Sequence, residues 1–196
     1  MNGNLEIERR FFVDGHGLKP WHNCESQSKI MQFYLDSSEL NVLDGVLRYG
    51  SIPLVPSINE SDIILDEGEW TARIRYSDSL TILTMKGPRV RATAVELEWE
   101  IERAKGEEIF LLKEFPSLEK IRYNWRGDDG MLWEIDEFEG VLSGLVLAEV
   151  ELESEETPIE IPSWVGREIT GEGSLSNAAL AHITNLNQLE MFSEPR

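Results

Sequence analysis

Apolar and polar residues alternate along much of the chain, with the period of two that half-buried β-strands show. In the stretch NLEIERRFFV, residues 4–13, one face carries Glu6, Glu8 and Arg10, and the other face is mostly apolar. Turn signals such as Asp44-Gly45 and Gly87-Pro88 separate several such stretches. The alternation predicts strands over residues 4–13, 30–36, 45–49, 61–66, 69–76, 79–86, 92–102, 119–126, 131–138 and 146–153.

Helical periodicity is scarcer. It predicts a short helix over 105–115, ended by Pro116, and a C-terminal helix over 177–192 with Ser176 as its N-cap; residues 24–31 are a candidate for a third helix. Residues 37–68 are the least regular part and indicate an insertion or an extended hairpin, which we expect to be ordinary surface rather than the cap of a cavity. The pattern as a whole predicts one α+β domain over 1–196, mainly antiparallel β, built as a barrel or sandwich.

Composition narrows the class of protein. The 196 residues are 41% hydrophobic and 9% aromatic, enough for a globular core. The 18 basic and 37 acidic residues give a net charge of −19, which argues against nucleic acid or an anionic membrane as partner. The only cysteine, Cys24, excludes an intramolecular disulfide, and the sequence shows no secretory signal and no apolar run near membrane-spanning length. We therefore expect a cytoplasmic protein.

The polar faces of the strands are nearly all ionised, and their signs are segregated. Arg73 and Arg75 share one face, as do Lys120 and Arg122, whereas other strands are purely acidic on the same side. One interpretation is that these charged side chains are simply exposed to solvent and have no specific role, as is common on alternating strands. Like charges side by side destabilise a sheet, however, unless each stack has a counterion. A divalent metal for the acids and a polyanion for the bases would supply it, so we predict a barrel whose charged face points inward.

Several segments then match a known family in order. Glu6-Ile7-Glu8-Arg9-Arg10 stands where that family has Glu-x-Glu-x-Lys, and it is followed by ARIRY, LTMKGP, VELEWEI, KIRY, WEIDEFEG, AEVELE and PSWVGREIT. The chain resembles the CYTH domain, also called the triphosphate tunnel metalloenzymes, over almost its whole length except 37–68. The resemblance implies an eight-stranded closed tunnel barrel with a charged interior, helices packed outside, and hydrolysis of triphosphates with Mg²⁺ or Mn²⁺.

The resemblance also implies roles for individual residues. The metal ligands would be Glu6, Glu8, Glu96, Glu98, Asp136, Glu149 and Glu151, although Glu96 and Glu98 could instead support a water or the facing basic residues. The triphosphate would bind to Arg10, Arg73, Arg75, Lys86, Lys120 and Arg122. The residues expected to matter most for catalysis are Glu6, Glu8, Arg10 and Lys86. The role of Tyr34 stays open.

One departure from the signature stands out. Arg10 replaces the signature lysine, and its planar guanidinium can bind phosphate through two nitrogens or pair with neighbouring glutamates.

These residues predict a divalent-metal-dependent triphosphatase that hydrolyses the terminal phosphate of inorganic tripolyphosphate or of an organic triphosphate. Two alternatives stay open at this point: an adenylate cyclase of the CYTH type, and a non-catalytic module that binds polyphosphate or a nucleotide. We expect a monomer or homodimer with a small-molecule triphosphate as its partner. His16, His22 and His182 lack the spacing of a metal site, and we expect them to be structural.

Overall fold

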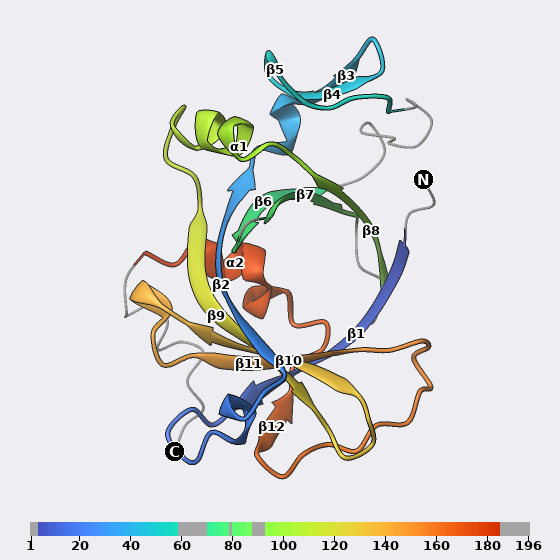
Figure 1. Cartoon of the computed structure of the whole chain (residues 1–196), viewed down its shortest axis with the longest axis vertical. Coiled ribbons are helices and arrows are strands. Elements are labelled where there is room, and N and C mark those ends of the chain that lie inside the picture. The colour runs from blue at the N-terminus through green and yellow to red at the C-terminus, as the bar shows by residue number, and fades with distance from the viewer. Residues whose placement is uncertain (1–3, 59–69, 79, 88–92, 185–196) are drawn as a thin grey trace.

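The computed structural model describes residues 4–58, 70–78, 80–87 and 93–184 (Figure 1). The predicted strand over 61–66 and the last part of the predicted C-terminal helix lie outside these residues. In the described part, the protein is mainly antiparallel β with few helices, which confirms the predicted class. No helix of the described part is long and apolar enough to cross a membrane.

In the described residues, nine strands form the main sheet, and hydrogen-bonded pairing follows the order β11-β10-β9-β2-β6-β7-β8-β1-β12. β1 also pairs with β11, so the series of paired strands that starts at β11 meets β11 again after β1. In Figure 1 the strands from β11 to β1 in this order surround the centre of the view, and β12 lies below them. The strands are β1 (Asn4–Val13), β2 (Ser26–Leu35), β6 (Thr71–Ser77), β7 (Leu80–Lys86), β8 (Thr93–Glu100), β9 (Ser117–Arg126), β10 (Leu132–Phe138), β11 (Val146–Glu151) and β12 (Val165–Glu168).

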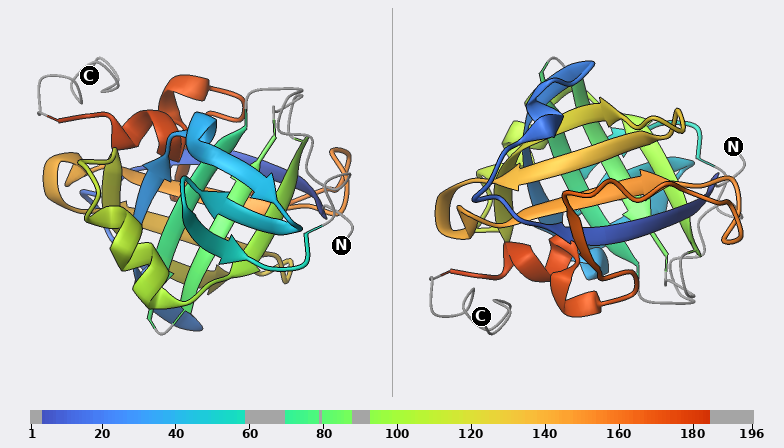
Figure 2. Two further views of the ribbon diagram at one scale, coloured as in Figure 1. Left: turned by 90° about the horizontal axis from the view of Figure 1, so that it is seen from above. Right: turned by 90° about the horizontal axis from the view of Figure 1, so that it is seen from below.

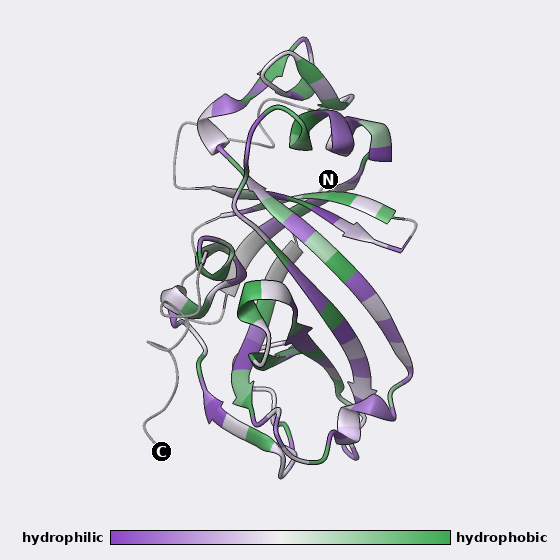
Figure 3. Cartoon of the chain, turned by 90° about the vertical axis from the view of Figure 1, so that its left-hand side faces the viewer, coloured by the Kyte–Doolittle hydropathy of each residue, from purple (hydrophilic) through white to green (hydrophobic). Residues whose placement is uncertain are grey.

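The alternation of the sequence sorts side chains to the two faces of this sheet, and it is visible as stripes along the strands in Figure 3. On β10, Trp133 and Ile135 are fully buried in an apolar cluster, whereas Glu134 between them faces the opposite side. Trp133 pairs with Val150 of β11 in the antiparallel register, and Val150 belongs to the same cluster. The apolar face of the main sheet is thus the one that packs against the rest of the chain.

A three-stranded sheet covers part of that apolar face. It consists of β3 (Leu40–Leu43), β4 (Val46–Tyr49) and β5 (Ile52–Val55), and Figures 1 and 2 show it stacked outside β6, β7 and β8. Asp44 and Gly45 join its first two strands with positive φ at both positions, the geometry of a tight hairpin turn. Leu47 is fully buried in one cluster with Leu83. The inner side of this excursion therefore packs on the core of the main sheet.

The helices are short, and two predictions about them need correction. Residues 24–31 do not form a helix, because Ser26–Leu35 is a strand that pairs with β6 on one side and β9 on the other. The C-terminal helix begins as predicted, with the Ser176 side chain accepting a hydrogen bond from the Ala179 amide. The α-helices are α1 (Arg103–Phe110) and α2 (Asn177–Ala181), and the 3-10 helices are η1 (Pro20–His22), η2 (Ser37–Glu39), η4 (Gly140–Leu142) and η5 (Gly173–Leu175).

The two α-helices occupy different places. α1 packs outside the main sheet through Ile109, as expected. α2 lies instead across one opening between the strands that surround the centre of Figure 1, and Asn177 and Ala178 line the cavity described below. The prediction that all helices pack outside is therefore wrong for α2.

Candidate active site

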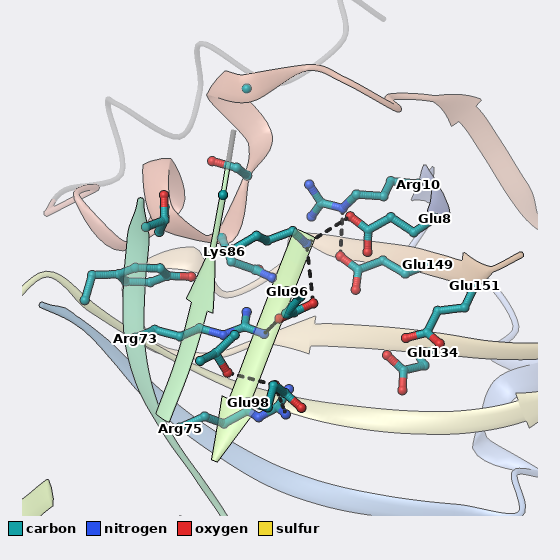
Figure 4. Close-up of a pocket in the computed structure, with 18 of the residues that line it drawn as sticks. Glu8, Arg10, Arg73, Arg75, Lys86, Glu96, Glu98, Glu134, Glu149 and Glu151 are labelled. Atoms are coloured by element: carbon teal, nitrogen blue, oxygen red, sulfur yellow. Dashed lines mark hydrogen bonds and ion pairs between the residues drawn. The ribbon is translucent and has the colours of Figure 1, made fainter. Parts of the chain in front are cut away.

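A cavity of about 860 Å³ lies against the polar face of the main sheet (Figure 4). Neutral residues contribute to its lining, among them Tyr34, Thr84, Ser176 and Asn177. Most of the lining is ionised: Glu8, Arg10, Arg73, Arg75, Lys86, Glu96, Glu98, Arg122, Glu134, Glu149, Glu151 and Glu172. The charged faces of strands distant in sequence therefore meet at one cavity.

Four glutamates form what we call the acidic wall: Glu8, Glu134, Glu149 and Glu151. They come from β1, β10 and β11, which are neighbours in the sheet. Glu8 stands opposite Glu151 in the β1–β11 register, and Glu134 stands opposite Glu149 in the β10–β11 register. Figure 4 shows these carboxylates on one side of the cavity. Such like-charge pairs are unfavourable in a sheet that has no counterion.

Three cations form the facing basic wall: Arg73 and Arg75 of β6, and Lys86 of β7. Glutamates of β8 hold them. Arg73 Nη2 lies 3.4 Å from Glu96 Oε1, and Arg75 Nη2 lies 3.2 Å from Glu98 Oε1. Lys86 Nζ lies 3.9 Å from Glu96 Oε2 and 3.8 Å from Glu8 Oε1, so it stands between the two walls.

A buried ion-pair group lies beneath the cavity lining. Asp136 is 1% exposed and accepts hydrogen bonds from Arg122 Nε at 2.7 Å and from Lys120 Nζ at 2.5 Å. Arg122 also donates to Glu134, and its Nη2 donates to Glu149 at 3.0 Å. Arg122 therefore ties the floor of the cavity to two members of the acidic wall.

Burial and the charges of the arginines shift the pKa values of these glutamates in opposite directions. Burial raises the pKa of Glu149, but the adjacent Arg10 and Arg122 outweigh burial, so the pKa falls well below its usual range. Burial also raises the pKa of Glu134, and there the opposing effect of Arg122 is too small, so the pKa stays above its ordinary value. Glu134 consequently takes up a proton more readily than Glu149.

Burial also disfavours the charged form of Lys120. Burial lowers the pKa of its ammonium group to about 8, and the charge of Asp136 offsets only part of the effect.

Two further side chains orient the cations at the cavity. Arg10 donates from Nε to Glu149 Oε1 at 2.7 Å and from Nη1 to the carbonyl oxygen of Leu175 at 3.2 Å. The Tyr34 hydroxyl hydrogen-bonds Arg73 and accepts a bond of 2.7 Å from Gln32 Nε2. Burial raises the pKa of Tyr34, which keeps the hydroxyl protonated.

The donor chemistry of the acidic wall suits a hard divalent cation, because carboxylate oxygens are the ligands that Mg²⁺ and Mn²⁺ prefer. In the described residues no group of three or more potential ligands is already arranged around a metal position. Glu134 and Glu149 instead hold Arg122, and Glu149 also holds Arg10. The carboxylates therefore suit a divalent ion chemically. To bind it, Glu134 and Glu149 would have to release the guanidinium groups of Arg122 and Arg10.

The structure places the sequence-predicted residues in three groups. Lys120 and Asp136 pair with each other below the cavity and do not line it. The backbone of Glu6 belongs to β1, but its side chain lies outside the described part. The remaining predicted residues all line the cavity: Glu8, Arg10, Arg73, Arg75, Lys86, Glu96, Glu98, Arg122, Glu149 and Glu151.

Sequence reasoning assigned no site role to several lining residues. Glu134 shares the polar face of β10 with Asp136, so the alternation alone could have found it. Thr84 lies two positions before Lys86 on the same face of β7, and it donates to Glu98 at 2.8 Å. Glu172 and Asn177 come from the irregular stretch around α2, where no periodic signal marks them.

Comparison with known proteins places this arrangement in a family. The sequence profile of the CYTH domain matches residues 57–181, more than half of the chain. The protein belongs to the CYTH domain family. The chain is 39% identical over 118 residues to an inorganic triphosphatase of Acetivibrio thermocellus, an alignment that spans 60% of this chain and 75% of that protein.

A second relative and a solved structure also match most of their own length to this chain. An inorganic triphosphatase of Nitrosomonas europaea is 39% identical over 111 residues, which is 56% of this chain and 73% of that protein. A crystal structure of an inorganic triphosphatase superposes with a TM-score of 0.57 at 27% identity, covering 92% of this chain and 99% of that one. The CYTH assignment thus holds for both sequence and fold.

Proposed function

We propose that this CYTH protein is a divalent-metal-dependent triphosphatase, a hydrolase that releases the terminal phosphate of inorganic tripolyphosphate. The observation that carries the proposal is one cavity with an acidic wall on one side and a basic wall on the other. The names of its relatives, inorganic triphosphatases at 39% identity, support the same reaction. The chain would act as a single domain whose circuit of eight paired strands, β11 to β1, encloses a tunnel.

The basic wall would bind the phosphate chain. Arg73 and Arg75 lie two residues apart on β6, so their guanidinium groups face the cavity in succession. Buried donors remain for a ligand: among the described residues, Arg73 Nε and Arg10 Nη2 have no hydrogen-bond partner. Arginine suits phosphate because its planar nitrogens match two oxygens at once. Glu96 and Glu98 would hold Arg73 and Arg75 in place for this task.

The acidic wall would hold the metal ion through Glu8, Glu149 and Glu151, with Glu134 beside them and Glu6 as a further predicted ligand. When bound, Mg²⁺ or Mn²⁺ neutralises phosphate charge and lowers the pKa of a water molecule. Lys86 stands between the two walls and would neutralise the phosphate group nearest the carboxylates. Phosphoryl transfer depends mainly on such positioning and charge compensation.

The lining favours an inorganic substrate. Among the described lining residues the one aromatic side chain is Tyr34, and it is buried and occupied by Gln32 and Arg73. A nucleobase would find no aromatic face for stacking in this part of the cavity. The net charge of −19 argues against nucleic acid and anionic membranes as partners. We further expect the protein to be cytoplasmic and to act as a monomer or homodimer.

Release of phosphate from a set of triphosphates tests the proposal. Tripolyphosphate, ATP and thiamine triphosphate are each incubated with Mg²⁺, with Mn²⁺ or with EDTA, and orthophosphate is measured with malachite green. We expect orthophosphate from tripolyphosphate in the presence of a metal and none in EDTA. Cyclic nucleotide and pyrophosphate from ATP would indicate the cyclase reaction, and binding without turnover would indicate a binding module; either result would overturn the proposal.

A further inference from the structure

We infer that Arg10 couples binding of the triphosphate to the seating of residues 169–181, which we call the closing segment. This inference rests on the proposed function.

The closing segment forms part of the cavity. It runs from the end of β12 through η5 to α2, and Figure 2 shows it at one side of the main sheet. It supplies six residues to the lining: Gly171, Glu172, Gly173, Ser176, Asn177 and Ala178. Its apolar side chains, Leu175 and Leu180, are buried in one cluster with Leu118 and Leu147 of the main sheet, so the segment has a defined resting position.

Arg10 contacts the closing segment at three points. Its backbone amide donates to Thr170 Oγ1 at 3.0 Å, and its carbonyl oxygen accepts a bond of 2.8 Å from the Ile169 amide. Its side chain reaches further along the segment, where Nη1 donates to the carbonyl oxygen of Leu175 at 3.2 Å. Only this last contact depends on the identity of the side chain.

The other two nitrogens of the same guanidinium group are Nε and Nη2. Nε donates to Glu149 of the acidic wall at 2.7 Å. Nη2 is buried and has no hydrogen-bond partner among the described residues, and Arg10 is one of the residues that line the cavity. One rigid, planar group therefore joins the acidic wall and the closing segment, and keeps one donor for a phosphate oxygen.

A lysine at this position could not make the same link. Its three donors share a single nitrogen at the end of a flexible stem, so it has no rigid plane that spans Glu149, the Leu175 carbonyl and the ligand. The arginine in place of the signature lysine thus adds a connection from the ligand to the closing segment. A phosphate on Nη2 would fix the plane of the guanidinium and strengthen the bond to Leu175.

Hydrogen–deuterium exchange measures this link directly. The probe is bisimidotriphosphate, the tripolyphosphate analogue with NH bridges, added with Mg²⁺ at a concentration that calorimetry shows to be saturating. The reporters are the amides of Leu175, Ser176 and Leu180, which bond within the closing segment. We expect bound probe to slow their exchange about tenfold in the wild type, and this slowing to be lost in Arg10→Lys at saturation.

Two variants serve as controls. Arg75→Lys alters the basic wall away from the closing segment, so it should weaken probe binding yet keep the protection once saturated. Arg9→Lys changes the neighbouring residue, which points to Glu168 on the other face, and should behave as the wild type. If Arg10→Lys does not fold, the wild-type exchange alone decides: bound probe without protection overturns the inference.

The outcomes separate the two claims. Protection in the wild type and Arg75→Lys but not in saturated Arg10→Lys supports the coupling. Equal protection in saturated Arg10→Lys overturns the coupling and leaves the proposed function intact. A wild-type protein that does not bind the probe overturns both.

Discussion

Glu8 on β1 stands directly opposite Glu151 on β11, and both side chains line the charged cavity. Two carboxylates in register on neighbouring strands repel each other unless a cation lies between or beside them. Lys86 Nζ, 3.8 Å from Glu8, supplies part of that charge.

Glu8→Gln should lower the turnover of tripolyphosphate about 100-fold, because the variant loses one anionic metal ligand that stabilises the transition state indirectly. The melting temperature should stay within a few degrees, since repulsion from Glu151 is relieved as the attraction to Lys86 is lost. Turnover over a range of Mn²⁺ concentrations and thermal unfolding check the two statements. Glu153→Gln, at an exposed position just beyond β11, is the control. Unchanged activity in Glu8→Gln would remove Glu8 from the metal site.

Glu98→Gln distinguishes a positioning role from a metal-binding role. Glu98 holds Arg75 and accepts a hydrogen bond from Thr84. If it positions Arg75, KM for tripolyphosphate should rise about tenfold while the metal concentration for half-maximal activity stays the same. Steady-state kinetics in which substrate and Mg²⁺ are varied separately give both numbers. A large rise in the metal requirement would instead show Glu98 to be a ligand.

The Lys120–Asp136 pair predicts a dependence of stability on alkaline pH. Burial lowers the pKa of Lys120 to about 8, whereas a lysine in an unfolded chain titrates near 10.4. Between these pH values the unfolded chain binds the proton and the folded protein does not. The free energy of unfolding therefore increases as the pH rises, by about 3 kcal/mol at most. The difference between wild type and Lys120→Met, measured by urea unfolding from pH 7 to 10, should show this gain. A difference that stays flat with pH would contradict the lowered pKa.

The three-stranded sheet should contribute stability without affecting catalysis. Leu47→Ala removes a fully buried side chain and should lower the free energy of unfolding by about 2–4 kcal/mol. KM for tripolyphosphate should not change, because none of the described lining residues comes from this sheet. Leu43→Ala is a matched control at a 55% exposed position and should cost little. Loss of substrate affinity in Leu47→Ala at a temperature where it is folded would assign the sheet a role at the cavity.

The sequence predicted the cavity side of the strands because that property is local. The period of two fixes which face Glu8, Arg75 and Glu149 share within each strand, and like charges in a row favoured an enclosed face over an exposed one. Membership of the CYTH domain family then agreed with the resemblance carried by the motifs.

What the sequence left undecided depends on contacts between distant segments. Asp136 and Glu134 share one face of β10, yet only Glu134 lines the cavity, because Lys120 and Arg122 of β9 hold Asp136 below it. No pattern within β10 distinguishes the two. The strand predicted over 30–36 begins earlier, at Ser26, where residues 24–31 were a candidate helix; there the pairing with β9 outweighs a weak local preference.

The measurement that tests the central claim most directly is a crystal structure of the wild type with Mn²⁺ and bisimidotriphosphate, with anomalous data that locate the metal. We predict manganese at the carboxylates of Glu8, Glu149 and Glu151, and phosphate groups against Arg73, Arg75 and Lys86. Manganese and the triphosphate analogue bound elsewhere on the molecule, with the charged cavity empty, would contradict the account.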